Sequence, residues 1–184
     1  MGDWPQQAGP MGLQASVITP LHPWALGNTS AASGTAVFAS AAWPTTNLGL
    51  FVPFRLPVPV IAYQLVTGCG TTAGGNFDIG IYNRNDIGGS VESLIVSSGS
   101  TARVASSEVV VNIADTFLGP GCYYLALSVD GTDNMILQTL AVAGLAAILG
   151  VREAASAFPL GATESVTTTA GTVVPDVQIR LRSF

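Results

Sequence analysis

Apolar residues recur at every second position along much of this chain. The alternation is clearest in four runs, at residues 76–82, 108–113, 123–130 and 177–182. Successive side chains of a β-strand point to opposite faces, so each run predicts a strand with one face on a core. In the first run, Phe77, Ile79 and Ile81 mark that face.

Short apolar runs bounded by Gly, Pro, Asn and Ser predict further strands at residues 35–41, 49–55, 58–67, 93–97 and 135–142. About nine strands without a convincing helix predict an all-β fold, a two-sheet sandwich of jelly-roll or related Greek-key type. Pro53, Pro57 and Pro59 predict sheet edges or a bend, because proline cannot donate to a strand ladder. Asn85-Asp86 and Asp130-Gly131 predict hairpin turns.

Residues 1–35 predict an irregular, extended N-terminal arm, and residues 36–184 a single β-sandwich domain. Four prolines and several Gly and Ser residues break the arm into extended and turn geometry. Trp4, Leu21 and Trp24 stand out in it as large apolar side chains. They either anchor the arm on a neighbouring subunit or fold back on their own domain.

Charge is scarce in this chain. Only 9% of the residues are charged, none is lysine, and the net charge is −5. Soluble domains carry roughly 25% charged residues, which keep their surfaces wet and apart. A single folded copy would expose a large, weakly polar surface, so we expect other protein subunits to cover it. The same composition lacks a basic surface for nucleic acid or for anionic membranes, and neither partner is predicted.

Residues 135–151 form a stretch without a charge. It is interrupted by polar residues and glycines and is shorter than the roughly 20 apolar residues of a membrane-spanning helix. We expect a buried strand that runs into a loop, with Leu145, Ile148 and Leu149 packed on another subunit. No export signal is predicted, because the first ten residues lack a basic segment followed by an apolar run.

No motif predicts an enzyme, a cofactor or a metal centre. His22 is the only histidine, no serine-hydrolase signature surrounds a serine, and a phosphate loop needs a lysine. Cys69 and Cys122 lack zinc-site spacing, so two buried thiols are favoured over a single disulfide.

The acidic residues leave two readings open. Eleven carboxylates include pairs that a glycosidase needs, and Asp130 with Asp133 offers calcium ligands, although turn capping explains most of these residues better. Tyr82 and Tyr124 point away from the predicted core faces of their strands. They form either a sugar-stacking platform or, as we favour, part of a subunit interface.

Three segments carry a resemblance to a known group of proteins: Gly75 to Asn83, Leu94 to Ser100 and Leu118 to Leu127. Their order and spacing resemble β-sandwich virion proteins of tailed bacteriophages. In that group a G-N-x-D-x-G-I-Y strand precedes an L-V-x-S-G-S strand and a P-G-x-Y-Y-L-A strand. Cys122 departs from the polar or small residue of that pattern, and residues 140–151 have no counterpart in it.

The resemblance implies a non-enzymatic virion structural protein made in the cytoplasm of a host bacterium. A capsid decoration or cement protein would form a homo-oligomer, a trimer, that clamps the major capsid protein with its arm. A tail-tip or tail-fibre protein would instead bind a host surface glycan. The chain has no repeats or heptads for a fibre shaft, which favours the capsid.

Overall fold

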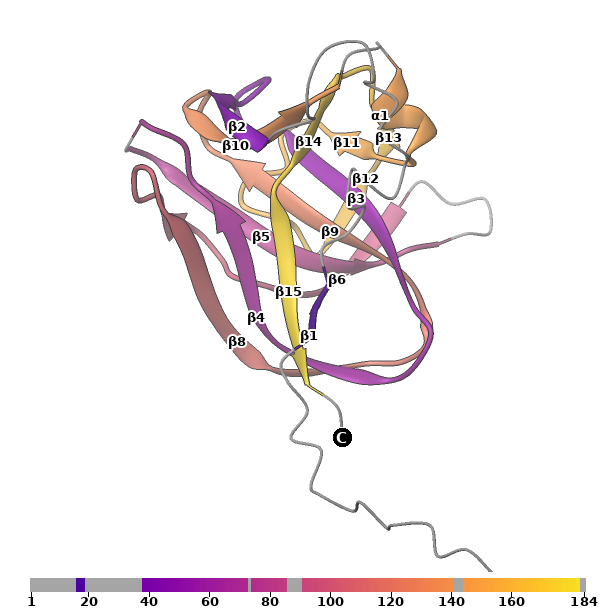
Figure 1. Cartoon of the computed structure of the whole chain (residues 1–184). Helices are drawn as coiled ribbons and strands as arrows, with labels where there is room; N and C mark the ends of the chain where they lie inside the picture. The colour runs from indigo at the N-terminus through magenta and orange to yellow at the C-terminus, as the bar shows by residue number, and fades with distance from the viewer. Residues whose placement is uncertain (1–15, 19–37, 73, 86–90, 141–143, 183–184) are drawn as a thin grey trace, which may run out of the picture.

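The computed structural model of the chain describes residues 16–18, 38–72, 74–85, 91–140 and 144–182 (Figure 1). Within these residues the fold is all-β, as predicted, with one short helix. The strands are β1 (Ser16–Ile18), β2 (Phe38–Ala42), β3 (Gly49–Leu56), β4 (Val60–Gly68), β5 (Asn76–Asn83), β6 (Val91–Ser97), β7 (Thr101–Ala102), β8 (Glu108–Leu118), β9 (Gly121–Val129), β10 (Asn134–Thr139), β11 (Arg152–Ala154), β12 (Thr163–Ser165), β13 (Thr167–Thr168), β14 (Val173–Pro175) and β15 (Val177–Arg182), and the helix is α1 (Leu145–Ile148).

Each of the nine predicted strands is present, within a few residues of its expected bounds. They are β2, β3, β4, β5, β6, β8, β9, β10 and β15. The six additional strands are only two or three residues long, which is too short to show a period of two. The helical turn α1 was not predicted, and it follows β10 where a loop was expected.

The strands form three antiparallel sheets. The first has the order β1-β15-β4-β8, and the second has the order β12-β6-β5-β9-β3-β11-β13, with β7 also paired to β5. A small third sheet has the order β14-β10-β2. The first two sheets face each other across the core as a sandwich.

A two-stranded ribbon rolls from one main sheet to the other. β3 pairs with β9 along its whole length up to Leu56 and Gly121, and β4 pairs with β8 from Val60 and Leu118 onward. Both connections, β3 to β4 and β8 to β9, therefore cross the corner of the sandwich side by side (Figure 1). A long hairpin rolled around a core is the connectivity of the jelly-roll type.

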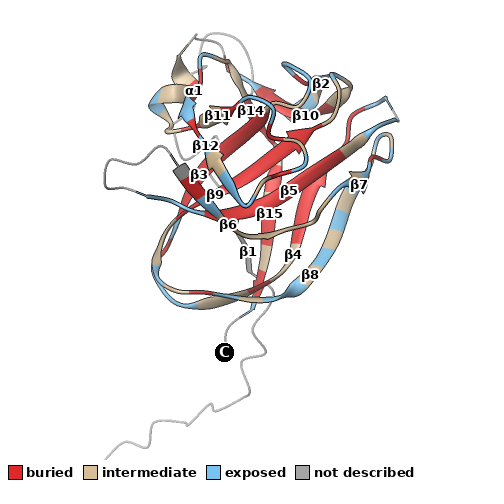
Figure 2. Ribbon diagram, turned by 180° about the vertical axis from the view of Figure 1, so that it is seen from behind, coloured by how far each residue is buried: buried red, intermediate tan, exposed pale blue. Residues whose placement is uncertain are grey.

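The main core lies between the two large sheets. Phe77, Ile79 and Ile81 are fully buried in it, as their alternation predicted, and Leu65 and Ile179 face them from the first sheet. Figure 2 shows β3, β5 and β9 buried along most of their length, whereas β8 alternates between exposed and half-buried positions. The predicted alternation of β8 is therefore confirmed, with solvent on one face.

The prolines lie where the sequence predicted an edge or a bend. Pro53 lies in β3 beyond Gly49–Phe51, the stretch that pairs with β11. Among the described strands, this part of β3 therefore pairs with β9 alone. Pro57 and Pro59 lie in the corner between β3 and β4.

One predicted hairpin is wrong. Asp130-Gly131 connects β9 to β10, but these two strands belong to different sheets and do not pair. The turn connects the large sheet to the small third sheet. The other predicted hairpin joins β5 to β6, which do pair, although its turn reaches into residues outside those described.

Part of the predicted arm is described. β1 pairs with β15 of the same chain, with Ser16 opposite Leu181 and Ile18 opposite Ile179. The arm therefore adds a strand to one edge of the first sheet. Trp4, Leu21, His22 and Trp24 lie outside the described residues.

Candidate functional site

The outer face of the first sheet carries a polar network that ends on β8. Arg180 of β15 reaches across β4, where its Nη1 donates to Gln64 Oε1 at 3.1 Å and its Nη2 lies 3.2 Å from Glu108 Oε1. Gln64 Nε2 in turn donates to Asn112 Oδ1 of β8 at 2.7 Å. Each charge on this network has a partner of the opposite sign or a polar neighbour within the same sheet.

A second ion pair crosses the same face near the other end of β8. Arg182 of β15 binds Asp115 of β8, and its guanidinium lies 5.9 Å from the centre of the Tyr63 ring. Arg180 and Arg182 thus neutralise Glu108 and Asp115, the two acidic side chains of β8. The outer flank of this strand is therefore electrically balanced.

Large apolar side chains are exposed beside these ion pairs. Phe117 of β8 is 61% exposed and Val110 of the same strand is 37% exposed. Val58, Val104 and Ile148 are exposed elsewhere on the described surface. Exposed aromatic groups on a weakly charged surface are typical of protein interfaces.

The three predicted contact residues of the apolar stretch are placed differently from one another. Leu145 and Leu149 are half-buried and pack against the chain's own core, because α1 folds back onto the sandwich. Ile148 points outward and is 81% exposed. Of these three residues, Ile148 alone exposes most of its side chain.

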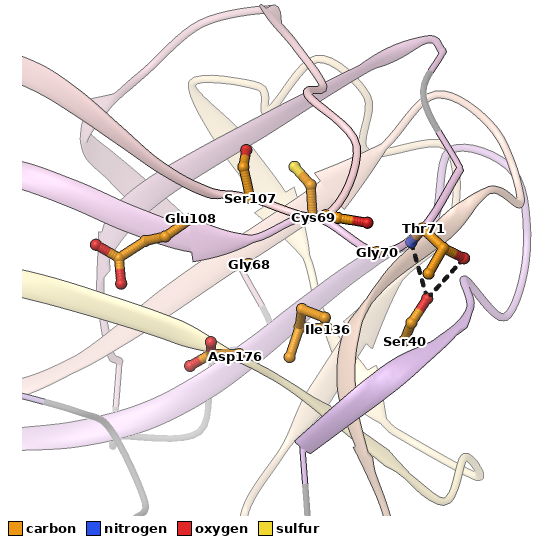
Figure 3. Close-up of a pocket in the computed structure, with 10 residues that line it drawn as sticks. Ser40, Gly68, Cys69, Gly70, Thr71, Ser107, Glu108, Ile136 and Asp176 are labelled. Atoms are coloured by element: carbon orange, nitrogen blue, oxygen red, sulfur yellow. Dashed lines mark hydrogen bonds between the residues drawn. The ribbon is translucent and has the colours of Figure 1, made fainter.

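A pocket of about 370 Å³ opens next to the first residues of β8 (Figure 3). Its lining comes from five separate parts of the chain and consists of Ser40, Gly68, Cys69, Gly70, Thr71, Ser106, Ser107, Glu108, Ile136 and Asp176. Figure 3 shows Glu108 and Asp176 at one end and Ser40 with Thr71 at the other. No motif in the sequence predicts this pocket, because its lining residues come from separate segments.

Hydrogen bonds between Ser40 and Thr71 fix one end of the pocket. Ser40 Oγ accepts from the Thr71 backbone N–H at 2.9 Å and lies 3.3 Å from Thr71 Oγ1. Gly70 has no room for a side chain, since a Cβ there would lie 2.6 Å from Ser40 Oγ. Hydroxyls and carboxylates in such a pocket can bind the hydroxyl groups of a small polar ligand.

Cys69 and Cys122 are both free thiols, as favoured from the sequence. Cys69 follows β4 and is buried, and its burial raises the pKa of the thiol. Cys122 lies in β9 and is half-buried. Neither thiol therefore cross-links the two sheets.

An arginine lies between the two acidic residues that were weighed as calcium ligands. Arg103 Nη2 lies 3.3 Å from Asp130 Oδ1 and 2.7 Å from Asp133 Oδ2, and its side chain is fully buried. Asp130 Oδ2 also accepts from the Asn76 backbone N–H at 2.8 Å, which confirms its turn-capping role. Gly75 must be glycine, since a Cβ would lie 2.3 Å from both the Arg103 guanidinium and the Asp130 carboxylate. This cluster fastens the β9–β10 turn to β5 and fills the space a cation would need.

Tyr82 and Tyr124 point away from the main core, as expected, but the prediction that they form a sugar platform or a subunit interface is wrong. Tyr82 and Tyr124 are buried in a second core on the far side of the large sheet, where the Phe51 ring lies 5.2 Å from that of Tyr82 and 6.2 Å from that of Tyr124. Residues 154–166 cover this face, and the Tyr82 hydroxyl donates to the Gly161 carbonyl at 2.7 Å. Burial raises the pKa of Tyr82. These rings therefore form neither a sugar platform nor a subunit interface.

Asp78 ties the same covering segment to β5. It is almost completely buried, its Oδ2 accepts from the Leu160 backbone N–H at 3.1 Å, and its Oδ1 accepts from Ser98 Oγ at 3.1 Å. Burial raises the pKa of this carboxyl group, and the hydrogen bonds oppose part of that rise. Asp78 thus holds the covering segment against β5. The alternating pattern of β5 did not predict this role.

Comparisons with known proteins identify no relative of this chain. No protein-family model, curated protein or solved structure matches this chain. Within the described residues no helix is long and apolar enough to cross a membrane, and no three His, Cys, Asp or Glu side chains group around a metal position.

Proposed function

We propose that this chain is a non-enzymatic structural protein of a bacteriophage virion, most consistent with a decoration protein on the capsid surface. It would assemble with copies of itself, as a trimer or another small oligomer, and with the major capsid protein. The observation that carries the proposal is the charge-balanced β8, which ends its sheet among the described strands and exposes Phe117, in a chain of which only 9% is charged. Such a surface is stable when other subunits cover it.

The arm supports the same proposal. β1 adds a strand to the sheet edge at β15, so the residues on either side of β1 start from a fixed point on the sandwich. Trp4, Leu21 and Trp24 lie in those flanking residues. Large apolar side chains on an extended arm suit a clamp between neighbouring capsid subunits, because they bury much area for little chain length.

We expect shell binding to depend on these anchors. A full-length variant with Trp4, Leu21 and Trp24 replaced by alanine should keep the circular dichroism of the wild type, yet bind capsids of the encoding phage at least tenfold more weakly, a loss of about 1.4 kcal/mol. Co-sedimentation with purified capsids measures this binding. Equal binding by the variant and the wild type contradicts the clamp, and absence of binding by the wild type contradicts capsid placement.

A second candidate function is recognition of a host glycan at the virion tail, and the pocket beside β8 favours it. Four hydroxyl side chains and two carboxylates line that pocket, all able to bind sugar hydroxyls. Retention of the wild type on host cell-wall glycans, lost on Thr71→Val, would support this function. A lack of retention across a broad glycan panel would remove it.

A further inference from the structure

The two edges of the first sheet differ. At one edge β1 covers β15, whereas β8 at the other edge pairs with β4 alone among the described residues. β8 is also the longest described strand, with eleven residues, and it is the outermost strand in both views (Figures 1 and 2). A long strand with one free side presents a row of backbone N–H and C=O groups to a further strand.

The usual protections of a free edge are scarce on β8. It contains no proline and no lysine, and its two acidic residues, Glu108 and Asp115, are held by Arg180 and Arg182 of the same sheet. A shift in register opposite Ala62 to Gln64 interrupts the strand near its middle, and this irregularity is the one protective feature present. Among the described residues, no strand pairs with the rest of this edge.

We propose that β8 pairs antiparallel with β8 of a second copy of this chain, which joins the two first sheets into one continuous sheet. The inference rests on the proposed function and names one contact by which copies would assemble, a twofold pair and not a trimer. Antiparallel pairing of a strand with itself places its irregular middle, around Ala114, near the twofold axis. The N-terminal half of each β8 then lies along the C-terminal half of the other.

A second copy suits this edge better than an unlike strand. Antiparallel self-pairing brings the exposed Val110 of one copy to the half that carries Phe117 in the other, so apolar groups meet on one flank. Because each carboxylate of β8 already has its own arginine, the pairing brings no unbalanced like charges together. The edge is thus complementary to itself in both polarity and charge.

The expected contact is small. A strand-to-strand contact buries less than the roughly 1,600 Å² of a standard interface, so we expect a reversible pair with a dissociation constant in about the micromolar range. On a virion many copies would be held close together, and the same contact would then be largely occupied. Weak pairing in solution is therefore compatible with a firm contact on the shell.

A cysteine at the predicted axis tests the geometry directly. Full-length Ala114→Cys should form a disulfide-linked dimer on mild oxidation, because Ala114 is exposed and would lie close to its own copy. Thr163→Cys, an exposed position on β12 of the other sheet, is the matched control and should stay monomeric on a denaturing gel. Wild type sets the baseline for the native thiols. No more dimer from Ala114→Cys than from the control overturns the proposal.

A charge at the same position tests the energetics. Ala114→Lys would place two ammonium groups side by side at the axis and should weaken self-association at least tenfold in sedimentation, whereas Thr163→Lys, on β12, should leave it unchanged. An unaffected oligomer, a trimer included, contradicts β8 pairing. A wild type that is monomeric at all tested concentrations contradicts it too. Capsid binding through the arm should survive Ala114→Lys, so failure of this contact and failure of the proposed function are distinguishable.

Discussion

Replacement of Arg103 by methionine is expected to lower the free energy of unfolding by about 3 kcal/mol. The arginine is fully buried and its Nη2 lies between Asp130 and Asp133, so its loss leaves two carboxylates facing each other without a counter-ion. Methionine keeps much of the apolar stem, which isolates the effect of the charge. Urea denaturation measures the change, and Arg55→Met, at an exposed position of β3, is the control for loss of an arginine.

The same cluster allows a sharper test. If the cost arises from the uncompensated carboxylates, addition of Asp133→Asn to Arg103→Met should restore part of the lost stability, although Asp133→Asn alone should destabilise the wild type. Such non-additivity is the sign of a direct pairwise interaction. Simple addition of the two costs would show that Arg103 stabilises the turn through packing and not through its charge.

Replacement of Asp78 by alanine is expected to lower the free energy of unfolding by about 3 kcal/mol. The change leaves the buried Leu160 N–H and the Ser98 hydroxyl without their acceptor and removes the tie between β5 and the segment that covers the second core. Asp78→Asn should cost less, because its amide oxygen can still accept from Leu160. Near-wild-type stability of Asp78→Ala would contradict this role.

Asp78→Asn also carries an expected dependence on pH. Burial raises the pKa of Asp78 above its usual value, so between those two values the folded state binds more protons than the unfolded state. The contribution of this carboxyl group to stability is therefore greatest at acid pH and falls as the pH rises through the folded-state pKa. The stability deficit of Asp78→Asn relative to wild type should accordingly shrink as pH rises. A constant deficit would contradict the raised pKa.

Much of the sandwich could be predicted because its long strands have one face on the main core. Phe77, Ile79 and Ile81 on β5 alternate cleanly with their neighbours, and all three are buried between the sheets. The second core could not be predicted in this way. Tyr82 and Tyr124 lie on the opposite faces of such strands, and the segment that buries them contains strands of two or three residues without a visible period.

The candidate site was harder to predict than the fold. Ser40, Cys69, Glu108 and Asp176 meet at one pocket only because the ends of several strands from two sheets converge there. The partner of Asp130 and Asp133 is likewise about thirty residues away in the chain, at Arg103. Alternation along single strands carries no information on such contacts, which depend on how the sheets are joined.

We propose that other subunits of a virion cover the weakly charged surface of this protein. The copy number of the chain in purified particles of the proposed phage tests this proposal, by quantitative mass spectrometry against the major capsid protein. We expect on the order of hundreds of copies per particle, as a symmetric shell requires. Complete absence of the chain from the particles would contradict it.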